Sequence, residues 1–197
     1  MTHLTPTIQR PRSLGAAIRT HATVLGASLT SVWAGFGADR IVGGALLPYG
    51  VQPRSLTGLR GVLLAPFLHA NFAHLVSNTV PLVLLGWLVM WRDARHFIPV
   101  TLLAMLGAGL LPWLIGAPGS VHIGASGVVF GYLGFLILAG WFARSATAIA
   151  LSLIVTAVWG GLVLGVLPGQ PGISWEAHFG GFIGGALAAK WLAPRRS

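Results

Sequence analysis

Residues 96–143 read HFIPVTLLAMLGAGLLPWLIGAPGSVHIGASGVVFGYLGFLILAGWFA and contain no Asp, Glu, Lys or Arg. A helix that spans the hydrocarbon core of a membrane needs about 20 apolar residues, so this run is too long for one helix. The dipeptide Pro118-Gly119 interrupts the run and predicts a turn between two helices. The stretch therefore predicts a membrane protein that crosses the bilayer more than once.

Low charge extends over most of the chain. Only 8% of the residues are charged and 55% are hydrophobic, whereas soluble proteins carry about 25% charged residues. Two further runs without charge are Gly61–Trp91 and Ser145–Trp175. Such a chain cannot cover a water-facing surface, which excludes an ordinary soluble enzyme. The chain also lacks cysteine, which excludes a disulfide framework, a thiol nucleophile and a cysteine-based zinc site.

We therefore predict an all-α polytopic membrane protein with a bundle of six transmembrane helices. The predicted spans are residues 22–47, 70–91, 96–115, 124–143, 146–166 and 175–193. They form a membrane domain at 21–194, flanked by a cytoplasmic N-terminal tail at 1–20 and a cytoplasmic C-terminal end at 195–197.

The first span and the loop after it have unusual features. Asp39 and Arg40 interrupt the span, so they either lie near its outer end or form an ion pair that faces the bundle. The following connection at 48–67 holds three prolines and is still apolar. This composition predicts a long first loop that lies at the membrane interface.

Basic residues give the orientation, because cytoplasmic ends of membrane helices collect Lys and Arg. With the N-terminus inside, the basic residues at cytoplasmic ends are Arg10, Arg12, Arg19, Arg92, Arg95, Arg144, Lys190, Arg195 and Arg196. Those at outer ends are Arg40, Arg54 and Arg60. Both termini are therefore expected in the cytoplasm. The same rule accounts for the net charge of +9, so no nucleic acid is expected as a partner.

Polar residues gather at one depth in this topology, because the spans at 70–91, 124–143 and 175–193 all start at the outer face. The polar residues near these starts are His69, His74, Asn78, Ser126 and His178. Polar groups inside a membrane are costly and usually face the bundle or a wet cavity. We therefore expect them to converge on one site.

Ser126 and His178 suit serine hydrolysis. The serine begins a helix, where free backbone N–H groups favour developing negative charge, and the histidine is the natural base. Their helices must then approach closely, which small residues at spacings of three and four allow. Such glycines are Gly124, Gly127, Gly131 and Gly134 in one helix, and Gly181 and Gly185 in the other. The same spacing also suits helix packing without any chemistry.

No carboxylate is well placed to orient His178. Asp93 lies on the cytoplasmic side, and Glu176 lies two residues before the histidine, roughly on the opposite helix face. We therefore predict a serine–histidine dyad in place of a triad, with Phe130 able to stack on the histidine ring. His122, four residues before the serine, is either a rival base or a loop histidine.

The stretch HANFAHLVSN at 69–78 supplies hydrogen-bond donors. His74 and Asn78 are four residues apart and share a helix face, and both can donate to an oxyanion. His69 is expected to support the first loop. The stretch is not an HExxH motif and has no third ligand, so no metal is expected.

Three motifs, HANFAHLVSN, GASG and AHFGGFIGG, resemble those of the rhomboid intramembrane serine proteases. They stand in the family's order on the matching helices, and the resemblance covers residues 45–193. It implies Ser126 as nucleophile and His178 as general base. It also implies an oxyanion hole from His74, Asn78 and the backbone amide of the serine, and it implies no cofactor. His69 matches a further histidine of the family.

The resemblance also implies the substrates. These would be single-pass membrane proteins, cut in or beside the transmembrane segment near the outer face and entering the site laterally from the lipid bilayer near 70–91 and 146–166. Helix-breaking residues, and a small residue before the cut, would be preferred. The oligomeric state is left open. The small six-span size suggests a prokaryotic plasma (inner) membrane.

The chain departs from the family pattern in two places, the first loop and the aromatic residue that is expected to stack on His178. Many rhomboids carry Trp-Arg in the first loop, where this chain reads GLRGV with Arg60. A tyrosine often stands where this chain has Phe130. Two other classes of function stay open: an inactive rhomboid-like protein that binds membrane clients, and a small transporter or channel.

Overall fold

The computed structural model describes residues 13–143, 145–170 and 172–193. Much of the predicted N-terminal tail and the whole C-terminal end at 195–197 lie outside these residues, as do five of the arginines used for the orientation. The described residues are helical apart from turns, connecting segments and one isolated β-bridge, which confirms the all-α prediction.

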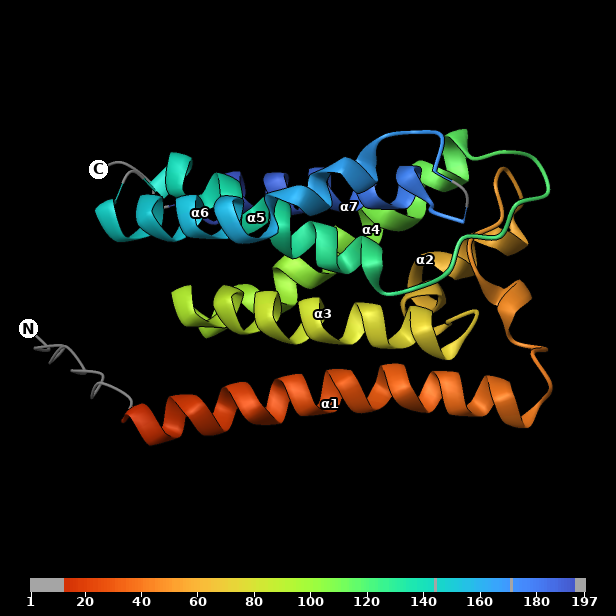
Figure 1. The fold of residues 1–197 in the computed structure, drawn as a ribbon, viewed down its shortest axis with the longest axis horizontal. Helices are drawn as coiled ribbons and strands as arrows, with labels where there is room; N and C mark the ends of the chain where they lie inside the picture. Colours follow the sequence, from red (N-terminus) through yellow and green to blue (C-terminus); the bar gives the residue numbers. More distant parts are fainter. Residues whose placement is uncertain (1–12, 144, 171, 194–197) are drawn as a thin grey trace, which may run out of the picture.

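Long helices run roughly side by side through the molecule (Figure 1). Their bounds are α1 Leu14–Ile41, α3 Phe72–Arg92, α4 Phe97–Ile115, α5 Ser126–Ala143, α6 Ala146–Trp159 and α7 Trp175–Trp191. Helix α1 lies at the edge of the bundle beside α3 (Figure 1). Short helical segments connect the long ones: η1 Leu47–Tyr49, η2 Thr57–Arg60, α2 Gly61–Leu64, η3 Ala65–Phe67, η4 Ala94–His96 and η5 Gly160–Val166.

Helix α1 begins and ends earlier than the predicted span at 22–47. Ser13 caps its start, because the Ser13 side chain accepts a hydrogen bond from the backbone N–H of Ala16. Gly43 and Gly44 follow its end with positive φ angles of 66° and 87°, which a helix does not tolerate. The part of the predicted tail from residue 14 onward is therefore helical.

Asp39 and Arg40 form the ion pair that was one of the two alternatives, with 2.5 Å between Asp39 Oδ2 and Arg40 Nη2. The Asp39 side chain is fully buried, whereas Arg40 stays partly exposed. The second carboxylate oxygen of Asp39 accepts from the backbone N–H of Leu46. The pair thus holds the chain where it leaves α1.

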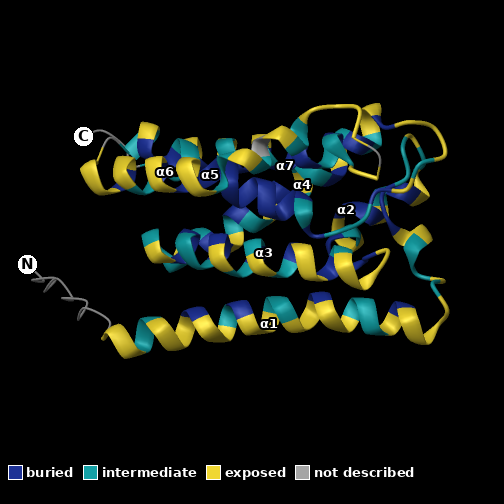
Figure 2. Cartoon of the chain, viewed as in Figure 1, coloured by how far each residue is buried: buried dark blue, intermediate teal, exposed yellow. Residues whose placement is uncertain are grey.

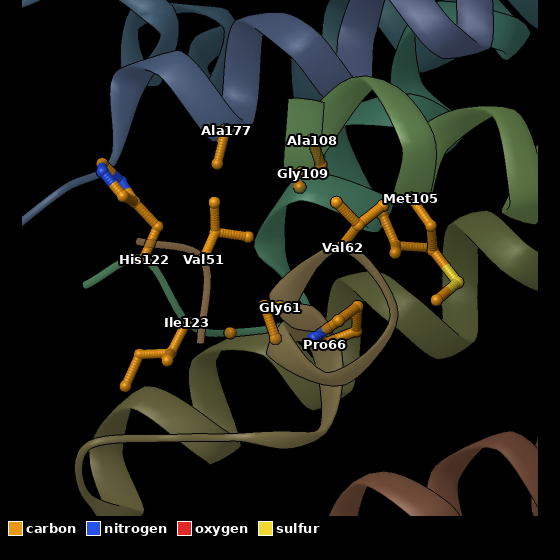
Figure 3. Close-up of a pocket in the computed structure, with 14 residues that line it drawn as sticks. Val51, Gly61, Val62, Pro66, Met105, Ala108, Gly109, His122, Ile123 and Ala177 are labelled. Atoms are coloured by element: carbon orange, nitrogen blue, oxygen red, sulfur yellow. The ribbon is translucent and has the colours of Figure 1, made fainter. Parts of the chain in front are cut away.

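Arg54 connects the first loop to the end of α4. The Arg54 guanidinium donates to the carbonyls of Leu114 at 3.1 Å and Gly116 at 2.9 Å, which the end of a helix leaves without partners. Arg60 instead lies over the Tyr49 ring, inside the loop. Figure 3 shows Val51, Gly61, Val62 and Pro66 of this loop around a cavity of about 20 Å³, which Ala108 and Gly109 of α4 and Ala177 of α7 also line.

Helices α5 and α7 pack backbone against backbone, as the glycine spacing predicts. A Cβ atom added at Gly181 would collide with the carbonyl of Gly127, and one added at Gly185 would collide with that of Gly131. Helix α4 packs on α7 in the same manner, because Gly107 and the α7 residue Gly180 face each other's carbonyls. These contacts bring the start of α5 and the start of α7 together.

The outer surface of the bundle is apolar. Three helical segments among the described residues are long and apolar enough to cross a membrane: Phe72–Arg92, Ala94–Ile115 and Ser126–Ala143. Large apolar side chains also lie exposed on other helices, such as Leu153, at 66% of its surface, on α6. Together these features identify a membrane protein.

Candidate active site

Ser126 and His178 meet where α5 and α7 begin. The Ser126 Oγ atom lies 2.8 Å from His178 Nε2, and the histidine is buried, at 8% of its surface exposed. Ser126 is the first residue of α5, and His178 lies in the first turn of α7. The close packing of the two glycine-containing helices therefore creates this contact.

Two groups hold the ring of His178. Its Nδ1 atom lies 2.9 Å from the carbonyl oxygen of Gly165, in η5. Because a carbonyl only accepts hydrogen bonds, Nδ1 carries the proton and Nε2 is left with the lone pair that faces Ser126. The ring of Phe130 stacks on the imidazole at a centroid distance of 4.1 Å and an interplanar angle of 9°. The imidazole is thus oriented as an acceptor for the serine proton.

The start of α5 offers backbone donors beside the serine. Within the described chain, the N–H groups of Ser126 and Gly127 have no hydrogen-bond partner, whereas Val128 and Val129 both donate to the carbonyl of Ala125. Free N–H groups at a helix start, together with the helix dipole, favour an anion. A negatively charged oxygen next to the serine would therefore be stabilised here.

His74 and Asn78 reach the same place from α3. Both line a cavity of about 640 Å³ that also contains Ser126, Phe130 and His178. The Asn78 side-chain amide donates one hydrogen bond to the backbone carbonyl of His74, at 2.9 Å, which leaves its second N–H without a partner among the described residues. Asn78 thus has a donor to offer to a bound group.

Gly124 brings α3 against the residues that precede Ser126. Its φ angle is +110°, and a Cβ atom there would lie 2.7 Å from the ring of His74. Gly124 lies before α5, so it does not belong to the small-residue face of that helix, as the spacing had suggested. Its task is conformational: only glycine readily takes this φ and leaves room for the His74 ring.

His69 contacts the segment that leads into Ser126, and not only the first loop. It is fully buried, and its Nε2 accepts a hydrogen bond from the backbone N–H of Ala125 at 3.3 Å. Its ring also lies 5.0 Å from that of His74, measured between centroids. Burial and the nearby His74 lower the pKa of His69 to about 4. His69 is therefore neutral at physiological pH, as an acceptor must be.

Glu176 lies two residues before His178 on α7. It lines the same cavity and is only 8% exposed. Glu176 makes no hydrogen bond to His178 or to any other side chain within the described residues, and the Gly165 carbonyl takes the place of a carboxylate.

The sequence did not reveal Gly165, because any residue can supply a carbonyl. The requirement for glycine at position 165 is steric. A Cβ atom there would lie 2.9 Å from Phe130 Cζ and 3.2 Å from His178 Nδ1. The alternative base, His122, makes no hydrogen bond to Ser126 and is bonded to Ser120 and Ser174 instead. No group of three His, Cys, Asp or Glu within the described ranges could hold a metal ion.

Comparison with known proteins places this chain in a family. The family model of the rhomboid domain matches residues 57–195. An uncharacterized protein of Mycobacterium tuberculosis is 42% identical over 167 residues, which cover 80% of this chain and 70% of that protein. An uncharacterized protein of Mycobacterium leprae is 40% identical over 167 residues, 80% of this chain and 66% of that one.

A plant relative bears the family name. RHOMBOID-like protein 4 of Arabidopsis thaliana is 34% identical over 127 residues, which cover 61% of this chain and 31% of the plant protein. The matched domain contains all the residues that line the cavity around Ser126 and His178. The motifs, the helical fold and the domain match agree, and the chain belongs to the rhomboid family.

Proposed function

We propose that this protein is an intramembrane serine endopeptidase that hydrolyses peptide bonds in or beside transmembrane segments of other membrane proteins. The observation that carries the proposal is the 2.8 Å contact between Ser126 Oγ and His178 Nε2, with the opposite ring nitrogen bonded to the Gly165 carbonyl. A hydroxyl bonded to an unprotonated, oriented base is the arrangement that nucleophilic catalysis requires.

The proposed reaction begins when Ser126 Oγ attacks the scissile carbonyl carbon and His178 Nε2 takes the hydroxyl proton. The resulting oxyanion accepts hydrogen bonds from the free N–H groups at the start of α5 and from Asn78 and His74. The imidazolium then gives its proton to the leaving amine, and an acyl-enzyme remains on the serine. Water, deprotonated by His178, attacks the acyl-enzyme and releases the second product.

The substrates we propose are single-pass membrane proteins that reach the cavity from the lipid bilayer. The apolar surface of α6 supports lateral entry, because it could exchange lipid for a substrate helix. We further propose that six helices span the membrane with both termini in the cytoplasm. The mycobacterial relatives support a bacterial plasma membrane as the location.

The second candidate is an inactive rhomboid-like protein that binds membrane clients. The uncharacterized state of the mycobacterial relatives leaves room for it. Against it stands the hydrogen-bonded contact of Ser126 and His178, since a client-binding protein needs neither the hydroxyl nor the oriented imidazole.

Cleavage of a transmembrane substrate in proteoliposomes separates the two candidates. We expect the wild-type protein to cut the substrate, and the variants Ser126→Ala and His178→Ala to bind it without cutting. Labelling of Ser126 by a fluorophosphonate is a second readout of the nucleophile. If the Ser126→Ala protein cut the substrate as fast as the wild type, the proposed function would be wrong.

A further inference from the structure

His122 connects three segments that surround the candidate site. Its backbone forms an antiparallel bridge with Val51 of the first loop, with N···O distances of 3.0 and 2.9 Å. One ring nitrogen, Nε2, lies 2.9 Å from Ser120 Oγ, and the other, Nδ1, lies 2.5 Å from Ser174 Oγ. Ser174 caps the start of α7. In Figure 3, His122 lies beside Val51 and the chain that enters α7.

The hydrogen bonds around this ring fix its protons. The Ser120 hydroxyl donates to the carbonyl of Ala117, so its oxygen accepts from the Nε2–H group of His122. The Nδ1 atom then carries a lone pair and accepts the proton of the Ser174 hydroxyl. The Ser174 oxygen in turn accepts from the backbone N–H of Ala177. Every proton has an acceptor only when His122 is neutral, so this histidine is not free to serve as a base for another hydroxyl.

The environment disfavours the charged form of His122. The residue is only 8% exposed, and burial lowers its pKa, although the nearby Glu176 carboxylate opposes the shift. The fit around the ring is also close, since a Cβ atom at Gly116 would lie 2.7 Å from His122 Nε2. The ring therefore has one fixed position between the two serines.

This pair repeats the spacing of the candidate dyad. His122 lies four residues before Ser126, and Ser174 lies four residues before His178, so each bonded pair is separated by 52 residues in the chain. The His122–Ser174 bond therefore ties the segment that enters α5 to the segment that enters α7. Any sliding between these segments would change the distance from Ser126 Oγ to His178 Nε2.

We propose that His122 and Ser174 form a positioning clamp, which holds the start of α7 in register with the start of α5 and so sets the separation of nucleophile and base. The inference rests on the proposed protease function. His122 is then a positioning residue and not a rival base. Because a misplacement of about 1 Å can cost about 100-fold in rate, loss of the clamp lowers kcat and leaves KM unchanged.

The test compares His122→Ala, Ser174→Ala and the double variant in the proteoliposome cleavage assay, with active sites counted by fluorophosphonate labelling. We expect kcat per active site to fall about tenfold to 100-fold in each single variant, and the double variant to fall no further, because both changes remove one interaction. His122→Asn, which keeps an acceptor near the Nδ1 position, should restore part of the rate. A kcat of His122→Ala within about twofold of the wild type would overturn the clamp.

His21→Ala is the matched control. His21 is also a buried histidine, at 6% exposure, but it lies on α1 against Trp87, so its truncation should affect stability and not kcat. Thermal unfolding of the wild type, His122→Ala, Ser174→Ala and the double variant tests the clamp without a substrate. If the wild type neither cleaves nor labels, the proposed function fails. Additive changes in Tm would then overturn the clamp as well, whereas coupled changes would support it.

Discussion

Helix α7 and the segment formed by α6 and η5 both contribute to the environment of His178, but they are built differently. Helix α7 lies against α4 and α5 with its glycines on their carbonyls, and much of it is buried (Figure 2). Helix α6 exposes large side chains, with Ile154 at 59% and Val158 at 67% of their surface. The proposed base thus sits on the tightly packed helix, and the carbonyl that holds its ring sits in the exposed segment. Stability of the fold and orientation of the base can therefore be changed separately.

The largest effect is expected from His178→Ala, which removes the proposed base and leaves the glycine contacts of α7 intact. We expect the cleavage rate to fall by about three powers of ten or more, with the same Tm as the wild type within a few degrees. Cleavage in proteoliposomes and thermal unfolding in detergent measure the two quantities. A variant that unfolds at a much lower temperature would show that His178 also supports the helix packing.

Gly165→Val tests the exposed segment. The added side chain would meet Phe130 and the Nδ1 atom of His178 and push the ring away from the carbonyl. We expect kcat to fall about tenfold to 100-fold, since small displacements of catalytic groups have effects of this size. The Tm should change little, because η5 lies outside the packed core. Gly161→Ala, in the same segment but with open space around it, is the control and should keep the wild-type kcat.

Gly185→Ala tests the tightly packed helix. Its Cβ atom would collide with the carbonyl of Gly131, so α5 and α7 must move apart. We expect a loss of about 1–3 kcal/mol in the free energy of unfolding, the usual cost of overpacking. Gly161→Ala should stay within about 0.5 kcal/mol of the wild type. If Gly185→Ala and Gly161→Ala were equally stable, α7 would not be more tightly packed than the α6–η5 segment.

Phe130→Leu should have the smallest effect. It removes the flat ring that stacks on His178 but leaves the hydrogen bond to Gly165 in place. An aromatic pair contributes about 0.5–1.5 kcal/mol beyond area burial, which corresponds to a rate loss of about threefold to tenfold. Phe130→Tyr keeps the ring and should lie within about threefold of the wild type. Comparison of kcat for the two variants isolates the stacking from the carbonyl contact.

The sequence predicted those features that depend on residue type and spacing. The family membership is confirmed by the domain match, and the close approach of the glycine faces of α5 and α7 follows from residues such as Gly181 and Gly185. The approximate helix positions also agreed, with the largest difference at α1, where Ser13 and Gly43 set the ends.

Contacts that use the backbone could not be predicted. The Gly165 carbonyl and the carbonyls that hold Arg54 have no signature in the sequence, because every residue carries the same group. The role of His122 could not be decided from the sequence either. Its partners Ser120 and Ser174 are common residues, and only the tertiary fold brings them into contact with the ring.

The carbonyl that orients His178 has a consequence for the response to acid. In a triad the orienting carboxylate can itself take up a proton, and its contact with the histidine then weakens. The Gly165 carbonyl has no proton to gain in that range, and it holds Nδ1–H at any pH at which the fold persists. Acid therefore cannot release the imidazole by protonating its orienting partner, and protonation of His178 at Nε2 is the step by which acid would block the proposed base.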